Sequence, residues 1–142
     1  MLVDANLLLY SALSGSPFYE RSRQWLGERL GSGERLGIAS ATVGAFLRIS
    51  TNPRAGSTPL SPARAWRFVE AWFTPPQVWI PAVSIRTIAI LGSLVVDHDP
   101  RSNLIPDAQL AALAIEHGLT VASHDAGFSR FKNVTWLDPL AA

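Results

Sequence analysis

Three of the eleven acidic side chains stand at positions where a carboxylate needs an explanation. Asp4 lies between apolar residues 2–3 and 7–10, and an unpaired carboxylate is costly among apolar neighbours. Asp107 begins a helical pattern, where an acid also stabilises the helix dipole. Asp125 follows an apolar stretch, where it could be an ordinary turn residue. The combination is therefore more informative than any one of the three.

Carboxylates that converge on one point repel each other, and a divalent cation between them offsets this electrostatic repulsion. Hard oxygen ligands suit Mg²⁺ or Mn²⁺. Such an ion can activate water and stabilise the charge that develops on a phosphodiester under attack. If Asp4, Asp107 and Asp125 meet in space, the chemistry they favour is metal-dependent hydrolysis.

Short strands alternate with helical patterns along the chain. We expect helices at 17–30, 40–49, 61–73, 84–94 and 106–117, with a further turn into a helix after Asp4. We expect strands at 2–3, 36–39, 78–80, 119–123 and 134–137. This alternation predicts an α/β domain with a parallel sheet, in which ligands gather beyond the carboxyl ends of the strands. Asp4 and Asp125 both stand at such ends.

Local signals indicate where several helices begin and end. Ser40 and Thr42, and separately Ser61 and Ser84, are candidate caps. Gly118 is a C-terminal stop. The polar residues 97–103 are expected to form a solvated loop rather than a metal site, although residues 97–99 read Asp-His-Asp. Trp25, Trp66 and Trp72 lie on amphipathic helices and are expected in the core.

Composition narrows the class of protein. A chain of 142 residues with 48% hydrophobic and 16% charged residues predicts one globular domain, 1–142, rather than a disordered chain. The net charge of +1 offers no bulk-charge argument for nucleic-acid binding. The absence of cysteine excludes thiolate zinc sites and cysteine nucleophiles. With neither an apolar run of about 18 residues nor a signal peptide, we expect a cytoplasmic protein that does not enter the membrane.

Four segments carry a family resemblance that covers essentially the whole chain. Residues 1–10, 103–114 and 123–128 resemble the acidic motifs of PIN-domain nucleases, and residues 46–54 resemble a segment common in VapC-type toxins of bacterial toxin–antitoxin pairs. The resemblance implies a PIN-like three-layer α/β domain with a short, mainly parallel sheet flanked by helices. It also implies an Mg²⁺- or Mn²⁺-dependent endoribonuclease that cleaves RNA, is neutralised by a cognate antitoxin and forms a homodimer.

Residue by residue, the resemblance assigns the metal and the catalysis to Asp4, Asp107 and Asp125. Asn6 stands where the family supports its first acid. Ala45 departs from the pattern, because it stands where the family usually has a glutamate, and this puts a second metal in doubt. Further supporting candidates are a hydroxyl and two polar residues close to Asp107 in sequence: Thr42, Asp99 and Asn103.

Several cations and one histidine are candidate contacts to RNA. Arg48 suits either a phosphate or an internal carboxylate, and these alternatives stay open. His124 could act as an acid or base or could hold substrate. The remaining candidates form a possible rim for the RNA backbone: Arg54, Arg101 and Arg130. Nothing in the sequence identifies a base sequence that the protein would read.

Two other functions compete with the nuclease. With Ala45 in place of the expected glutamate, the chain could be a catalytically weak or inactive PIN-like domain that acts by binding RNA or a partner. A phosphatase built on Asp4 ranks lower, because it lacks the second aspartate that such sites use. Residues 53–60 are a candidate mobile or partner-binding segment, and the apolar face of residues 17–30 could serve an antitoxin or a second subunit.

Overall fold

The computed structural model describes residues 1–54 and 58–141. Its sheet has five parallel strands in the order β3-β2-β1-β4-β5. The strands are β1 (Leu2–Val3), β2 (Leu36–Gly37), β3 (Val78–Trp79), β4 (Val121–Ala122) and β5 (Trp136–Leu137). The predicted loop at 53–60 includes residues 55–57, which lie outside the described residues.

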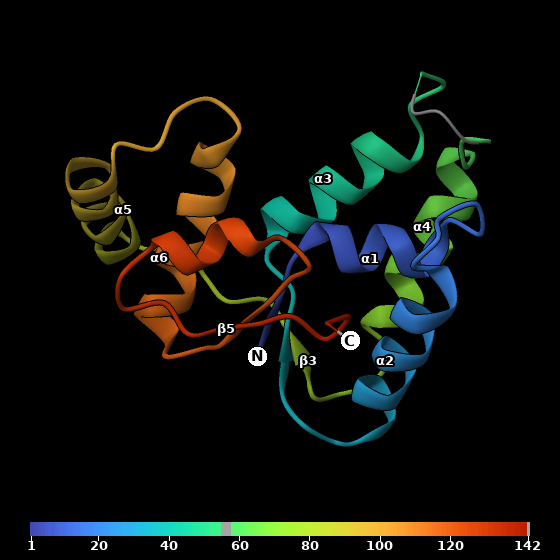
Figure 1. The fold of residues 1–142 in the computed structure, drawn as a ribbon. Helices are drawn as coiled ribbons and strands as arrows, with labels where there is room; N and C mark the ends of the chain where they lie inside the picture. The colour runs from blue at the N-terminus through green and yellow to red at the C-terminus, as the bar shows by residue number, and fades with distance from the viewer. Residues whose placement is uncertain (55–57, 142) are drawn as a thin grey trace.

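Helices cover both faces of this sheet (Figure 1). Their bounds are α1 (Ala5–Ala12), α2 (Tyr19–Gly31), α3 (Ser40–Ser50), α4 (Pro62–Trp72), α5 (Ile85–His98), α6 (Leu104–His117) and the 3₁₀ helix η1 (Ala126–Arg130). Adjacent strand residues point to opposite faces. Val3 accordingly packs into a core with α1 to α4, whereas Leu2 packs into a second core with α5, α6 and η1. The expected three-layer α/β fold with a parallel sheet is confirmed.

The register of the two central strands sets up the site. Leu2 pairs with Val121 and Val3 with Ala122, so the residues that follow the two strands emerge side by side. The backbone amide of Asp4 donates to the carbonyl of Ala122 at 2.9 Å, which continues the pairing to the sheet edge. The carboxyl ends of β1 and β4 therefore bring the start of the chain next to the residues around 123.

Several helix boundaries match the sequence signals. Ser61 accepts a hydrogen bond from the amide of Arg64 and precedes Pro62, and Ser84 caps α5. Gly118 ends α6 with φ 66°, a left-handed conformation that glycine adopts without strain. Helix α3 differs from the prediction, since it is capped by Ala39 without a side-chain bond. Ser40 is its first helical residue, not its cap.

Two predicted boundaries near α5 and α6 were wrong. Helix α5 continues to His98 instead of ending at residue 94, so Asp97 and His98 are helical and not part of a loop. It stops at Asp99, whose φ of 49° is left-handed, a conformation that aspartate tolerates better than most residues. Helix α6 begins at Leu104, two residues before Pro106. Proline fits there because the first turn of a helix needs no amide donor.

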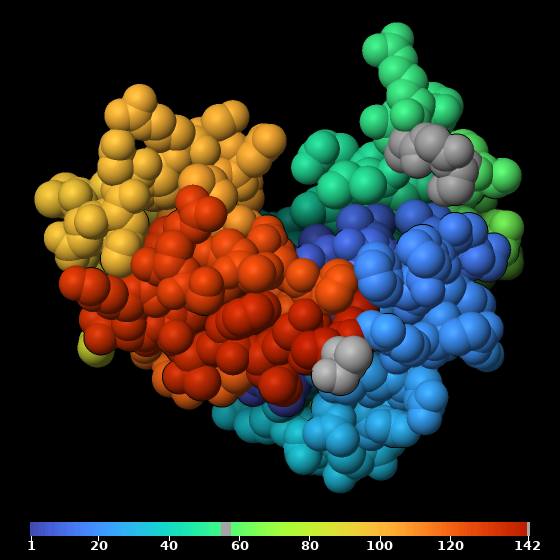
Figure 2. Space-filling model, in the orientation of Figure 1, coloured from blue at the N-terminus to red at the C-terminus, as the bar shows by residue number. Residues whose placement is uncertain are grey.

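The molecular surface corrects one prediction about the core. Trp72 is buried as expected and Trp25 is half-buried, but 49% of Trp66 is exposed. The most exposed of the large apolar side chains cluster in and just before α5, which packs mainly against α6: Val83, Ile85, Ile88 and Val96. On the face drawn in Figure 2, the surface is hollowed between α3 and the loop that joins α5 to α6. No helix among the described residues is long and apolar enough to cross a membrane.

Candidate functional site

Asp4 is held at the junction between β1 and α1. It caps the helix, because its Oδ1 accepts a hydrogen bond of 2.8 Å from the amide of Ala5. Its Oδ2 accepts a hydrogen bond of 2.7 Å from the hydroxyl of Ser123. Burial raises the pKa of this carboxyl, these two hydrogen bonds act in the opposite direction, and the charge of Asp125 raises the pKa further.

Ser123 is a fully buried residue that connects the elements of the site. Besides donating to Asp4, its oxygen accepts from the side-chain amide of Asn6 at 3.1 Å and from the backbone amide of Asp125 at 3.0 Å. One hydroxyl donor and two acceptor lone pairs are therefore all engaged. The expected support of Asp4 by Asn6 runs through this serine.

Sequence reasoning missed Ser123. The available signal was a small polar residue at the end of an apolar strand, two positions before a candidate acid. The sequence alone does not identify the role of Ser123, because Ser123 lies beside Asp4 only as a result of the pairing between β4 and β1.

Asp107 and Asp125 meet beside Gly127. Asp125 caps η1, where its Oδ1 accepts from the amide of Gly127 at 2.8 Å. A Cβ atom at position 127 would lie 3.0 Å from that Oδ1 and 3.7 Å from Oδ2 of Asp107. Glycine thus leaves the room that allows both carboxylates to approach the same turn.

The environment of Asp107 is strongly unfavourable to its charge. Burial and the negative charges of Asp125 and Asp4 raise the pKa of this carboxyl to about 7, with the positive charge of Arg130 acting in the opposite direction. Three carboxylates thus interact electrostatically at the carboxyl ends of the two central strands. Excess negative charge with hard oxygen donors is the chemistry that suits a divalent cation.

The side chains do not enclose an ion as they stand. Among the described residues, no group of three histidine or acidic side chains is arranged to hold a metal. The donor chemistry therefore fits a cation, but closing the coordination shell requires a shift of side chains or water ligands. Mg²⁺ commonly keeps several waters, so incomplete protein coordination is compatible with it.

The other predicted supporting residues lie in different settings. Thr42 is buried near the start of α3, and Asn103 is exposed just before α6. Asp99 is engaged elsewhere, because its carboxylate forms an exposed ion pair of 2.8 Å with Arg101. The charges that act on Asp107 do not include that of Asp99.

The predicted RNA contacts also differ in whether they touch the residues of the acidic cluster. Arg130 is tied to the site, since it donates to the carbonyl of Gly127 at 3.1 Å and its charge acts on Asp107. Arg48 and Arg54 are exposed and form no ion pair among residues 1–54 and 58–141. For Arg48, this counts against pairing with an internal carboxylate. His124 pairs through Nδ1 with Asp138, at 2.9 Å and 3.0 Å from its two oxygens.

The family model for the PIN domain matches residues 1–134. The chain belongs to the PIN-domain family. It is 34% identical over 140 residues to Ribonuclease VapC33 of Mycobacterium tuberculosis, covering 99% of this chain and 98% of that protein. It is also 34% identical to Ribonuclease VapC37 of the same species, over 99% of this chain and 97% of that protein.

Solved structures agree on the fold of this PIN domain. VapBC2 from Rickettsia felis, bound to a DNA fragment from its promoter, matches with a TM-score of 0.68 and 14% identity over 96% of each chain. VapC20 of Mycobacterium tuberculosis, described as a Sarcin-Ricin loop cleaving toxin, matches with a TM-score of 0.68 and 15% identity over 94% of this chain and 98% of that one. A toxin–antitoxin complex from Klebsiella pneumoniae gives 0.68 and 18% identity over 99% and 98%.

Proposed function

We propose that this PIN domain is a divalent-metal-dependent endoribonuclease, and that it acts as the toxin of a toxin–antitoxin pair. The main support is the convergence of Asp4, Asp107 and Asp125 at the carboxyl ends of β1 and β4, with the rise in the pKa of Asp107 to about 7. Full-length relatives named ribonucleases support the same reaction.

In this proposal, Asp4 and Asp107 hold the cation, and Asp125 contributes directly or through a water. A bound Mg²⁺ or Mn²⁺ would supply positive charge to the phosphodiester and acidify the attacking water. Ser123 and Ala5 fix the two oxygens of Asp4, so this carboxylate is oriented before substrate arrives. The arginine side chains then offset phosphate charge that the cation does not reach.

The proposed contacts to RNA differ in how close they lie to the acids. Arg130 and His124 are tied to the residues around Asp125. Arg48 and Arg101 belong to the two segments that border the hollow in Figure 2, and Arg54 follows α3. The four arginines would hold the backbone rather than read bases.

The donor atoms also bear on which divalent cation binds and on how many bind. Oxygen donors suit both Mg²⁺ and Mn²⁺. Ala45, on α3, supplies no carboxylate where the family usually has one, so we propose one fully formed metal site. Thr42, Asn103 and Asp99 remain supporting candidates for the outer shell.

The proposal extends to partners and place of action. Relatives solved as toxin–antitoxin complexes support an antitoxin protein as the inhibitor. A small upstream open reading frame that rescues growth when co-expressed would test the antitoxin.

We further propose that residues 1–142 act as one domain, that the chain pairs with a second copy, and that it works in the cytoplasm. Size-exclusion chromatography with light scattering tests the pairing.

One experiment separates the nuclease from its main alternative. Purified protein is incubated with total RNA in the presence of Mg²⁺, Mn²⁺ or a chelator. We expect cleavage with either cation, none with chelator, and none from Asp4→Asn under any condition. RNA binding without cleavage by the wild-type protein would favour the weak or inactive PIN-like domain instead.

A further inference from the structure

Three aromatic rings that the acidic cluster does not use gather beside it. The rings of Phe18 and His124 are 4.6 Å apart between centroids, Tyr10 and Phe18 are 5.0 Å apart, and Tyr10 and His124 are 6.2 Å apart. Each of the three residues is half-buried, so each keeps part of its surface open to solvent. They come from α1, from the residue before α2, and from the residue before Asp125.

We propose that Tyr10, Phe18 and His124 form a stacking site for a nucleobase of single-stranded RNA next to the phosphate that is cleaved. The inference rests on the proposed endoribonuclease function. Proteins bind unpaired RNA by stacking its bases on aromatic side chains, and this contact tolerates every base because each has a π-face. The sequence itself offers no base-reading motif, which agrees with a contact of this kind.

The position of the rings relative to the acids supports the proposal. Asn6 and Tyr10 are one helical turn apart on α1 and therefore share a face. Asn6 binds Ser123, and its Oδ1 accepts from the backbone amide of His124 at 3.4 Å, so this face of α1 meets the segment that carries Asp125. Burial raises the pKa of the Tyr10 phenol, and the negative charges of Asp4, Asp125 and Asp138 raise it further, so the ring lies within electrostatic reach of the acids.

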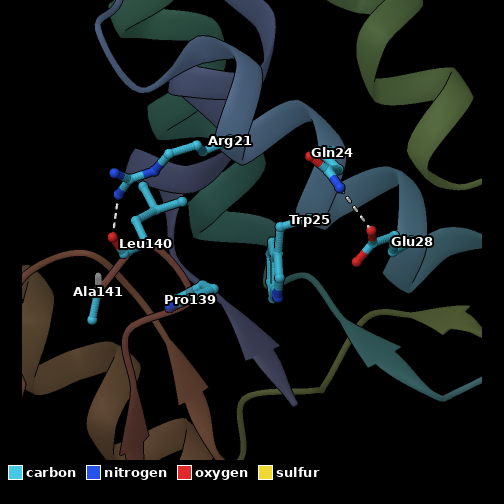
Figure 3. A pocket seen from close by; sticks show the side chains of 7 residues that line it. All are labelled: Arg21, Gln24, Trp25, Glu28, Pro139, Leu140 and Ala141. Atoms are coloured by element: carbon cyan, nitrogen blue, oxygen red, sulfur yellow. Dashed lines mark hydrogen bonds between the residues drawn. The ribbon is translucent and has the colours of Figure 1, made fainter.

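The histidine ring is held in place before substrate binds. Asp138 accepts from Nδ1 of His124 and also from the backbone amide of Leu140 at 2.9 Å. The guanidinium group of Arg21 donates to the carbonyl of Leu140, which ties α2 to the C-terminal segment (Figure 3). A ring fixed in this way loses little side-chain entropy when a base stacks on it.

A positively charged side chain, Arg21, lies beside the ring of Phe18 and could contact the RNA backbone. The guanidinium of Arg21 lies 5.8 Å from the centre of the Phe18 ring. This side chain extends from α2 toward the C-terminal segment, as Figure 3 shows. An aromatic group flanked by one exposed arginine matches the combination of stacking and backbone charge that single-stranded nucleic acids require.

The test uses a short single-stranded RNA that contains the fluorescent base 2-aminopurine, whose emission is quenched when it stacks. Binding is measured to the full chain carrying Asp4→Asn, so that cleavage does not interfere. We expect quenching on binding. Adding Tyr10→Leu or Phe18→Leu should remove most of the quenching and weaken binding by about ten-fold, within the range found for a lost stacking contact.

Matched variants separate stacking from packing. Tyr10→Phe and Phe18→Tyr keep a ring and should restore both quenching and affinity. Trp66→Leu removes an exposed aromatic side chain from α4 and should change neither. Circular dichroism and thermal unfolding establish that each variant is folded. If Tyr10→Leu fails to fold, the Phe18→Leu and Phe18→Tyr pair decides the question.

Two results would overturn the proposal. The first is unchanged affinity and quenching in the folded leucine variants, which would leave the rings with a packing role between α1 and α2. The second is an equal loss in the leucine and ring-retaining variants. Failure of the wild-type protein to cleave RNA with Mg²⁺ or Mn²⁺ would instead contradict the proposed nuclease, and the quenching experiment does not depend on that result.

Discussion

The hydroxyl of Ser123 donates a 2.7 Å hydrogen bond to Oδ2 of Asp4, although 119 positions separate the two residues in sequence. The contact exists because β1 and β4 are neighbouring parallel strands that end at the same edge of the sheet. The first acid of the site is therefore oriented by sheet pairing and by its own helix cap together. Both constraints act without a bound ion.

Ser123→Ala should weaken both stability and cleavage. Its loss leaves a carboxylate oxygen of Asp4 and the side-chain amide of Asn6 without their partner, and unpaired buried polar groups cost about 1–3 kcal/mol. Urea unfolding measures the stability, and RNA cleavage measures the activity. Ser93→Ala is the control, because that hydroxyl is exposed on α5 and makes a long bond of 3.4 Å to its own helix. Equal stability of the two variants would show that the Ser123 bonds contribute nothing.

Asp4→Asn should abolish cleavage and leave the domain folded. Asparagine keeps an oxygen to accept from Ala5, and it caps helices about as well as aspartate. It removes the negative charge that a cation requires. Cleavage assays with Mg²⁺ and thermal unfolding are the measurements. Retained activity would contradict the assignment of Asp4 to the metal site.

The metal-free protein should lose stability as pH rises through the acidic to neutral range. Burial and the negative charges of Asp125 and Asp4 raise the pKa of Asp107 from its usual 3.8 to about 7, so between these values the folded state binds more protons than the unfolded state. Stability then falls with rising pH across that window, and the raised pKa of Asp4 acts in the same direction. Thermal unfolding from about pH 5 to about pH 8 measures the slope.

Two comparisons make the pH prediction specific. Asp107→Asn should flatten the pH dependence, because the residue no longer titrates. Adding Mg²⁺ or Mn²⁺ at the alkaline end should raise the melting temperature of the wild-type protein more than that of the variant. A wild-type slope that matches the slope of Asp107→Asn would contradict the prediction.

Ala45→Glu should tighten binding of Mn²⁺ if position 45 is an empty ligand position. The residue is half-buried on α3, and the family usually has a carboxylate there. Calorimetric titration of Mn²⁺ measures the change in affinity. Ala63→Glu adds the same charge at an exposed position of α4 and should leave affinity unchanged. No difference between the two variants would count against a vacant ligand position.

The sequence predicted those helix and strand boundaries whose causes lie in neighbouring residues. The apolar residues before Asp4, the Ser61 cap and the Gly118 stop each predicted the observed element, because the determinants lie within one or two turns. Tertiary context decided the cases that failed. Trp66 follows the helical pattern of a core residue, yet the buried face of α4 is formed by Ala65, Val69 and Trp72. Trp66 comes one position after Ala65, is rotated by about 100° from that face, and stays on the surface.

The cluster of acids was predictable as a set of residue types, but its hydrogen bonds were not. The net charge of +1 conceals a local cluster of Asp4, Asp107 and Asp125, since a sum over the chain contains no information about position. The role of Ser123 depends on strand pairing across most of the chain, and no periodicity within a short window encodes that pairing. The hydrogen bond between His124 and Asp138 could not be predicted from the sequence for the same reason.

The central position of β1 has a consequence for the order of events during synthesis. The first strand made pairs on one side with β2 but must wait for β4, at Val121–Ala122, on the other. A nascent chain that has emerged only as far as α6 carries Asp4 and Asp107 yet lacks both Ser123 and Asp125. On the proposed assignment, the polypeptide cannot cut RNA near the ribosome that makes it until β4 and Asp125 have emerged. The sheet order would thus delay a toxic activity until β4 has paired with β1.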